Sequence, residues 1–284
     1  MRWVDLAAMA ALAGIADTRA LADAFLARAL GLGDVAGAYA AHAVPGFVQH
    51  DPGLRDGEVA PAPPGQRRVT DMVLVDGDLF AALRHTFDGP DDAGTMVVDI
   101  WRAEGGRIAE HWSVAQPRPR ELAHGNGMAC GVGESWDSAG ARKDDPAAHA
   151  CGRPAPAARR AETLRTFQNY VGQIGAGDVR GAILRWLSDD YRQHSPVIAD
   201  GKQGALDYLV REWGDPAREK PVLGPPRLLV DGDLLLVHRL VMYPGRHEAS
   251  ANVDIFRVTD GRISEHWDFK QPVPADRINP REMW

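Results

Sequence analysis

The sequence GRISEHWDFKQP at residues 261–272 decides the fold, because the same pattern occurs 155 positions earlier as GRIAEHWSVAQP at residues 106–117. A second pair of motifs, FVQHDP at residues 47–52 and YRQHSP at residues 191–196, is related by a shift of 144 positions. Self-similarity over a long period is the signature of a duplicated architecture. The chain is therefore predicted to hold two copies of one domain in tandem.

The domain boundaries follow from composition. Residues 123–158 are rich in Gly, Ala and Pro and lack apolar periodicity, which predicts a linker. Residues 1–122 then form copy one and residues 159–284 form copy two.

The two shifts differ, so copy two carries an insertion between Gly201 and Leu228. Within it, residues 202–213 predict a helix, because apolar side chains recur at spacings of three and four. Copy one has the Pro-rich residues 58–65 instead, which cannot be helical. The pocket of copy one is therefore expected to be more open or degenerate.

Each copy places helices before strands. Helices are predicted at residues 18–31, 163–175 and 178–188, and strands at 227–230, 234–243, 250–258 and 262–271. This order is typical of an α+β fold in which the helices cover one curved, mainly antiparallel sheet.

Composition excludes several classes of function. The formal charge of −7 and the absence of a basic stripe argue against a nucleic-acid partner, and no apolar run is long enough to cross a membrane. The two cysteines, Cys130 and Cys151, are too few for a disulfide framework and fit a reducing compartment. A cytoplasmic location is predicted.

Three segments of copy two, at residues 191–196, 253–257 and 260–271, resemble the SnoaL-like polyketide cyclases of the nuclear-transport-factor-2-like (NTF2-like) superfamily. The resemblance implies a cone of helices wrapped by a strongly bent sheet, with a ligand cavity at the wide end. It also implies pairing through the sheets, so the fusion is expected to form a pseudo-dimer within one chain, with a further homodimer left open. The superfamily hosts cyclases, isomerases, epoxide hydrolases, dehydratases and binding modules, so the site has to decide the function.

One departure from the family pattern concerns the last strand. The cyclases carry their acid–base aspartate four residues after the tryptophan of this motif, where Gln271 and Gln116 stand in the two copies. Since glutamine exchanges no proton at neutral pH, the standard cyclase mechanism is not supported. Copy two does carry Asp268 next to its tryptophan, where copy one has Ser113.

Strand parity assigns faces to the candidate residues. His238 lies on the face of its strand that lacks other polar groups, so this face is expected to look inward, with a core histidine as the alternative. His194 is predicted to reach the pocket, the alternative being that it pins the turn before Pro196.

The last strand permits two arrangements. Glu265, Trp267, Phe269 and Gln271 share one face, and the aromatic side chains favour it as the concave, helix-covered one. His266 and Asp268 would then point away from the cavity. A β-bulge would reverse the faces, make Asp268 with His266 or His238 the acid–base pair, and mark copy one as inactive through Ser113.

The remaining candidates are a carboxylate, two aromatic residues and a set of histidines. Asp254 is expected either to be neutralised by Arg257 or another basic residue, or to line the cavity. Tyr191 and Trp267 are expected in the core or the cavity wall. A three-His metal site from His194, His238 and His266 is an alternative, as is a linker site from His124, Cys130, His149 and Cys151.

The leading hypothesis is an enzyme that needs no cofactor and transfers protons next to a carbonyl of a small, apolar, polyketide-like substrate, as an isomerase, cyclase, dehydratase or aldol-type enzyme. The predicted catalytic residues are His194, His238 and Asp268, and the predicted substrate-binding residues are Tyr191, Asp254, Trp267 and Gln271. The alternatives are a non-catalytic ligand-binding or scaffold protein and a metal-dependent enzyme.

Overall fold

A computed structural model describes residues 6–61, 63–89, 92–129 and 154–284, with side chains from residue 14 onward. Within these ranges no helix combines the length and apolar character needed to cross a lipid bilayer.

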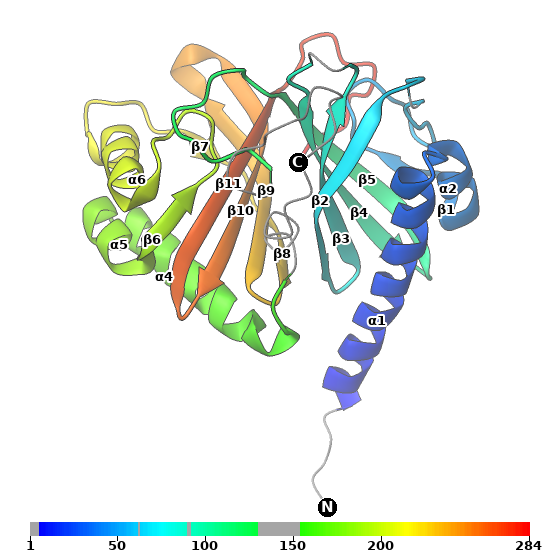
Figure 1. Cartoon of the computed structure of the whole chain (residues 1–284), viewed down its shortest axis with the longest axis horizontal. Coiled ribbons are helices and arrows are strands. Elements are labelled where there is room, and N and C mark those ends of the chain that lie inside the picture. The colour runs from blue at the N-terminus through cyan, green and yellow to red at the C-terminus, as the bar shows by residue number, and fades with distance from the viewer. Residues whose placement is uncertain (1–5, 62, 90–91, 130–153) are drawn as a thin grey trace, which may run out of the picture.

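Copy one packs helices on a five-stranded sheet (Figure 1). Its elements are α1 (Leu6–Leu26), the π-helical turn η1 (Ala27–Gly31), α2 (Val35–His42), β1 (Ala43–Gln49), β2 (Arg67–Asp76), β3 (Leu79–Phe87), β4 (Thr95–Glu104) and β5 (Arg107–Pro117). The strand order is β1-β5-β4-β3-β2, with β1 parallel to β5 and the other neighbours antiparallel.

Copy two repeats this plan. Its elements are η2 (Ala157–Arg159), α4 (Arg160–Gly175), α5 (Val179–Trp186), β6 (Leu187–Gln193), α6 (Gly201–Leu209), the π-helical turn η3 (Val210–Gly214), β7 (Val222–Leu223), β8 (Arg227–Asp231), β9 (Leu234–Tyr243), η4 (Pro244–Arg246), β10 (Glu248–Thr259) and β11 (Arg262–Pro272). The order β6-β11-β10-β9 matches copy one, and β7 and β8 share the outer edge of β9.

The α+β prediction is confirmed, with two differences in the elements. The first helix begins at Leu6 rather than at residue 18. A short strand follows the second helix in each copy, β1 and β6, which the sequence patterns did not indicate because it is brief and only partly apolar. The inserted helix is present as α6 with η3, and residues 58–61 and 63–65 form no helix.

Several repeated residues shape the backbone. Asp34 and Asp178 cap the N-termini of α2 and α5 by accepting hydrogen bonds from the backbone N–H groups of Gly37 and Gly181. The Asp260-Gly261 turn between β10 and β11 has positive φ at both positions, as a tight two-residue hairpin requires.

The two sheets pack against each other through the faces turned away from the helices, which lie on the outer sides (Figure 1). One core joins them, with Trp112, Val98 and Leu83 from copy one against Trp267 and Phe269 from copy two. Both faces of each sheet are therefore covered, and β3 and β9 carry near-continuous apolar runs rather than clean alternation. The duplicated chain thus forms its sheet-to-sheet contact internally.

The segment after the last strand of each copy crosses to the other copy. The backbone N–H of Ala123 donates to the carbonyl of Pro196, and that of Ile278 donates to the carbonyl of Pro52. Met128 and Met283, at the ends of these segments, are buried in the shared core. The first residues of the predicted linker are therefore packed structure, while residues 130–153 lie outside the described ranges.

Candidate functional site

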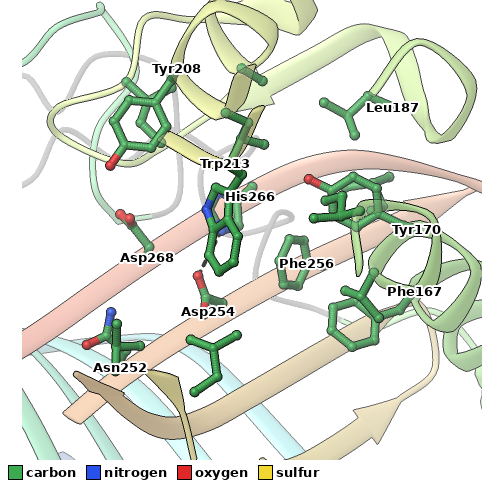
Figure 2. A pocket seen from close by; sticks show the side chains of 18 of the residues that line it. Phe167, Tyr170, Leu187, Tyr208, Trp213, Asn252, Asp254, Phe256, His266 and Asp268 are labelled. Carbon is green, nitrogen blue, oxygen red and sulfur yellow. Dashed lines mark hydrogen bonds and ion pairs between the residues drawn. The ribbon is translucent and has the colours of Figure 1, made fainter. Parts of the chain in front are cut away.

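Copy two encloses a cavity of about 290 Å³ between its helices and the concave face of its sheet (Figure 2). The wall is mostly aromatic and aliphatic, and its polar groups gather on the sheet. The aromatic residues are Phe167, Tyr170, Tyr191, Tyr208, Trp213, Tyr243 and Phe256, and the polar ones on the sheet are Gln193, Arg239, Asn252, Asp254, His266 and Asp268. A few polar groups in an apolar enclosure are typical of a small-molecule site.

A β-bulge sets which side chains of β11 enter this cavity. The register of β10 with β11 shifts at Ser264, between the pairs Val258–Ile263 and Arg257–Glu265. After the bulge, His266 and Asp268 face the cavity, whereas Trp267 faces the other sheet. The expectation that the aromatic face is concave was wrong, and the bulged alternative is the one observed.

Asp268 lies directly opposite Asp254 on the neighbouring strand β10. Burial raises the pKa of the Asp268 carboxyl above its ordinary value, and Asp254 adds to the rise, while His266 and the Ser195 hydroxyl oppose it. A second carboxylate close by and a desolvated position are the two conditions that keep an acid protonated toward neutrality. Asp268 is therefore a buried carboxyl on the cavity wall whose pKa lies above its ordinary value.

His266 is held at both ring nitrogens. Its Nε2 lies 3.2 Å from Oδ1 of Asp254, and its Nδ1 lies 3.2 Å from Oε1 of Gln193. The Gln193 amide is itself fixed, because its Oε1 accepts from the backbone N–H of His194 and its Nε2 donates to the hydroxyl of Tyr191. His266 therefore helps to hold the Asp254 carboxylate in place. Both of its ring nitrogens already have partners, so neither is free to bind a substrate.

Four tyrosines line the cavity, and three of them, Tyr170, Tyr191 and Tyr208, are more deeply buried than Tyr243. Burial raises the pKa of Tyr208 to about 12, and burial also raises the pKa values of Tyr170 and Tyr191. All three remain protonated near neutral pH and can donate hydrogen bonds. Tyr208 comes from α6, so the insertion that distinguishes copy two supplies one of these donors (Figure 2).

Arg239 on β9 is a cavity residue that the sequence patterns missed. It lies directly opposite Asn252 on β10 and lines the cavity. Its Nε has no hydrogen-bond partner, and in the part of the chain that the structure describes it forms no ion pair. The signal that could have found it is its alignment with Arg84 at the repeat shift.

His194, predicted as catalytic, lies outside the cavity. Its Nδ1 is 2.7 Å from the carbonyl of Gly127, in the segment that crosses over from copy one, and its Nε2 is 3.2 Å from Glu265. Its ring stacks on Trp267 at 4.5 Å. The prediction was wrong because Tyr191 and Gln193 of this motif line the cavity, whereas the His194 side chain points to the segment from copy one.

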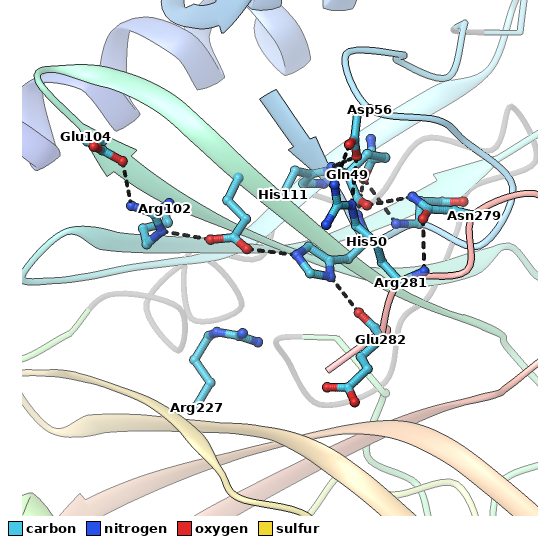
Figure 3. Close-up of polar contacts among 12 residues, drawn as sticks. Gln49, His50, Asp56, Arg102, Glu104, His111, Arg227, Asn279, Arg281 and Glu282 are labelled. Atoms are coloured by element: carbon cyan, nitrogen blue, oxygen red, sulfur yellow. Dashed lines mark hydrogen bonds and ion pairs between the residues drawn. The ribbon is translucent and has the colours of Figure 1, made fainter. Parts of the chain in front are cut away.

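The repeat of this arrangement in copy one explains why both copies keep the histidine (Figure 3). His50 stands between the carbonyl of Glu282, in the C-terminal segment, and the carboxylate of Glu110, and it stacks on Trp112 at 4.6 Å. Each histidine thus fastens the segment that arrives from the other copy.

His238, also predicted as catalytic, is fully buried between the two sheets. Arg227 donates a hydrogen bond from Nη1 to Nδ1 of His238 at 2.8 Å, and the guanidinium of Arg227 lies 3.6 Å from the centre of the Trp112 ring. Burial, reinforced by Arg227, lowers the pKa of His238 to about 3. The face without other polar groups is the one that packs on copy one, so the inward assignment was wrong and the core alternative is the one observed.

Two of the predicted substrate-binding residues also lie between the sheets. Trp267 donates from Nε1 to the carbonyl of Ala129 at 3.3 Å. Gln271 accepts a hydrogen bond from the backbone N–H of Ala115, and Gln116 accepts one from that of Lys270, each at 2.8 Å. Neither Trp267 nor Gln271 lines the cavity, whereas Tyr191 and Asp254 do.

The three-histidine metal site is not formed. His266 enters the cavity, while His194 and His238 lie beyond the sheet, and no group of three possible ligands gathers anywhere in residues 6–61, 63–89, 92–129 and 154–284. Of the linker alternative, Cys130, His149 and Cys151 fall outside those ranges. Arg257, expected as a partner of Asp254, pairs instead with Asp233 and Glu265.

Copy one has its own cavity, of about 380 Å³, with a different set of charges. Asp99 receives a hydrogen bond from Nε of Arg84 at 2.5 Å and lies 3.2 Å from Nε2 of His111. Burial alone would raise its pKa, but Arg84 and His111 hold the pKa of Asp99 well below its ordinary value. Ser113 stands opposite Asp99, where copy two has its second carboxylate.

Comparison with known protein families finds one similarity, within copy two. Residues 167–266 match the model of a SnoaL-like domain. Copy one lies outside this match, and its likeness to copy two rests on the shared strand order. A search of curated proteins finds no match.

Several solved structures are similar to part of this chain. TsrD from Streptomyces laurentii is 21% identical, with a TM-score of 0.33, over 39% of this chain and 90% of its own. An NTF2-like protein of unknown function from Mesorhizobium loti is 17% identical (TM-score 0.35; 42% and 97% covered). A protein described as a putative ketosteroid isomerase from Kribbella flavida is 20% identical (TM-score 0.33; 43% and 90% covered).

Proposed function

We propose that the cavity of copy two is the active site of an enzyme that moves a proton next to a carbonyl group of a small, mostly apolar molecule. The observation that carries the proposal is the Asp268 carboxyl, which lies on the cavity face opposite Asp254 with a raised pKa. A carboxyl whose pKa is shifted toward neutrality is a more effective acid and base at cellular pH than an ordinary aspartate.

The proposed step begins with the carboxylate form of Asp268, which accepts a proton from the carbon next to the carbonyl. The electrons of that C–H bond move to the carbonyl oxygen and form an enolate. Tyr208 and Tyr191 keep their hydroxyl protons and can donate hydrogen bonds to the developing negative charge.

The protonated Asp268 then returns its proton to the same carbon or to a conjugated one, which completes an isomerisation. In the cyclase and aldol variants the same enolate attacks a second carbonyl, and the protonated Asp268 gives its proton to the resulting alkoxide. In the dehydratase variant the enolate expels a β-hydroxyl group, which takes the proton of Asp268 and leaves as water. Asp254 and His266 act here as positioning residues, since each holds the other and both set the charge around Asp268.

The test is exchange of the α-protons of a panel of enolisable aryl ketones and β-keto esters in D₂O, followed by proton NMR. The wild-type protein is expected to accelerate exchange, and Asp268→Asn is expected to slow it by about 10²- to 10⁴-fold, the usual contribution of a general base. Ser113→Ala is the matched control in copy one and is expected to retain full activity.

A panel that binds without exchanging, or an Asp268→Asn variant as fast as the wild type, contradicts the proposal. Binding without exchange supports the alternative function of a ligand-binding protein. Circular dichroism of Asp268→Asn confirms that any loss of activity comes from a folded protein.

A further inference from the structure

We infer that the copy-two cavity takes a molecule that carries a carboxylate, and that Arg239 is the residue that binds it. This inference rests on the proposed function in treating the same cavity as the substrate site. It adds the chemical class of the ligand and a recognition residue.

The first observation is the isolation of Arg239. Its side chain lines the cavity, its Nε has no hydrogen-bond partner, and no described carboxylate lies within ion-pair distance of its guanidinium. Aromatic and aliphatic side chains form most of the surrounding wall. A partly buried cation without a counter-charge is costly, so an anion that enters this cavity is stabilised there.

The second observation is the contrast with copy one. There the counterpart Arg84 binds Asp99 at 2.5 Å, and His111 holds the other oxygen of the same carboxylate. In copy two the counterpart carboxylate, Asp254, is held by His266 and makes no ion pair with Arg239. The duplication thus kept the arginine but left its charge free for a ligand.

The third observation is the placement of Arg239 relative to Asp268. The two residues lie two strands apart and two positions apart along the sheet, because Arg239 pairs with Asn252 and Asp268 pairs with Asp254. Ordinary sheet spacings put their Cα atoms on the order of 12 Å apart. The reach of the two side chains shortens that gap, so one small molecule can touch both groups.

The chemistry of the guanidinium selects the anion. Its planar fork of N–H donors matches a carboxylate in a bidentate arrangement, and the facing amide of Asn252 is a further hydrogen-bonding group on the same wall. The aromatic wall suits a planar apolar body. The ligand class is therefore an aryl or unsaturated carboxylic acid.

The experiment measures binding by calorimetry at pH 7.5 with 2-naphthoic acid and trans-cinnamic acid, each beside its primary amide. The wild type is expected to bind the acids at least tenfold more tightly than the amides. Arg239→Met is expected to weaken acid binding about ten- to hundredfold, the loss typical of a charged hydrogen bond, and to leave amide binding unchanged. Arg239→Lys is expected to retain part of the preference, and Ser113→Ala, in copy one, all of it.

Equal binding of acids and amides by the wild type, an acid preference that survives in Arg239→Met, or failure of both acids to bind overturns the inference. These outcomes are separate from proton exchange. Loss of the acid preference with exchange that still depends on Asp268 removes only the assignment of the carboxylate. An acid preference that depends on Arg239, without any exchange, supports this assignment and removes the enzymatic proposal.

Discussion

In copy one, Arg84 and His111 together hold Asp99. In copy two His266 holds Asp254, and the arginine at the matching position, Arg239, forms no ion pair with any residue that the structure describes. In the cavity of copy one, the charged side chains Arg84 and Asp99 on the sheet are thus paired with each other. The cavity of copy two has in Arg239 a cation without an ion-pair partner among the described residues, and in Asp268 an additional carboxyl. Two pockets built on the same strands therefore differ in the groups that remain available to a ligand.

The residues that the two copies share and the residues in which they differ have different places in the structure. Residues that both copies keep, such as His50 and His194, fasten the segments that cross between the copies. The differences, Ser113 against Asp268 and the presence of α6, fall on the cavity walls. Residues common to both copies thus serve two roles: His50 and His194 hold the crossing segments, whereas Arg84 and Arg239 line the cavities, where the substitutions and α6 change the groups around them.

The largest effect is expected when Asp268 of copy two is replaced by serine, the residue that copy one has at the matching position. Asp268→Ser is expected to lower the rate of α-proton exchange by about 10²- to 10⁴-fold, because it removes the base. The reverse change, Ser113→Asp, is expected to leave that rate unchanged, since copy one lacks α6 and its arginine is already paired. A variant that combines Asp268→Ser with Ser113→Asp and still exchanges protons at the wild-type rate would contradict the assignment of the activity to copy two.

The next effect concerns the face of β11 that packs on copy one. Trp267→Ala is expected to destabilise the protein by about 3–5 kcal/mol, because a fully buried aromatic ring is removed from the core that joins the two sheets. Denaturant unfolding measures this change, with the exposed Val197→Ala as control. Unfolding of copy two alone, with copy one unaffected, contradicts a shared core.

A smaller effect is expected at the C-terminal crossover. The Asn279 side-chain amide donates to the carbonyls of Gln49 and Leu54, at 2.6 and 2.9 Å. Asn279→Ala leaves both acceptors without this donor and is expected to cost about 1–3 kcal/mol. Hydrogen exchange of β1 amides reports whether the loss is local, and Asp276→Ala, at an exposed position of the same segment, serves as the control.

The smallest effect separates Gln271 from the site. Gln271→Met removes the acceptor of the Ala115 N–H and is expected to cost about 1 kcal/mol of stability while ligand affinity stays the same. Chemical denaturation and calorimetry measure the two quantities. If Gln271→Met weakened ligand binding and left the stability unchanged, Gln271 would have to be assigned to the ligand-binding site.

Much of the fold was predictable from the repeat and from local patterns. The bounds of β9, the inserted helix and the Asp260-Gly261 turn all follow from apolar spacing or turn chemistry. The strands β1 and β6 did not, because short segments beside helices carry little periodicity. The α+β class could be predicted without these short strands, because it follows from the order of helices and longer strands in each copy.

The site was less predictable because strand parity gives two faces without naming the concave one. The rule of one charged and one apolar face fails where both sides of a sheet are buried, which explains the wrong assignments of His238 and Trp267. The bulge at Ser264 changes the parity of β11, and nothing in the sequence places it at that residue. Arg239 was missed because a sequence does not show whether an arginine forms an ion pair. Among the described residues it forms none.

The central claim is that the cavity of copy two holds a carboxyl set to exchange protons at Asp268. Its most direct test is a titration of ¹³C-labelled aspartate carboxyls by NMR, with the signal absent from Asp268→Asn assigned to this residue. We expect a midpoint above the ordinary aspartate value of 3.8, and a contribution to stability that is present below that pH and lost as the pH rises through the folded-state pKa. A signal that titrates at or below 3.8 would contradict it.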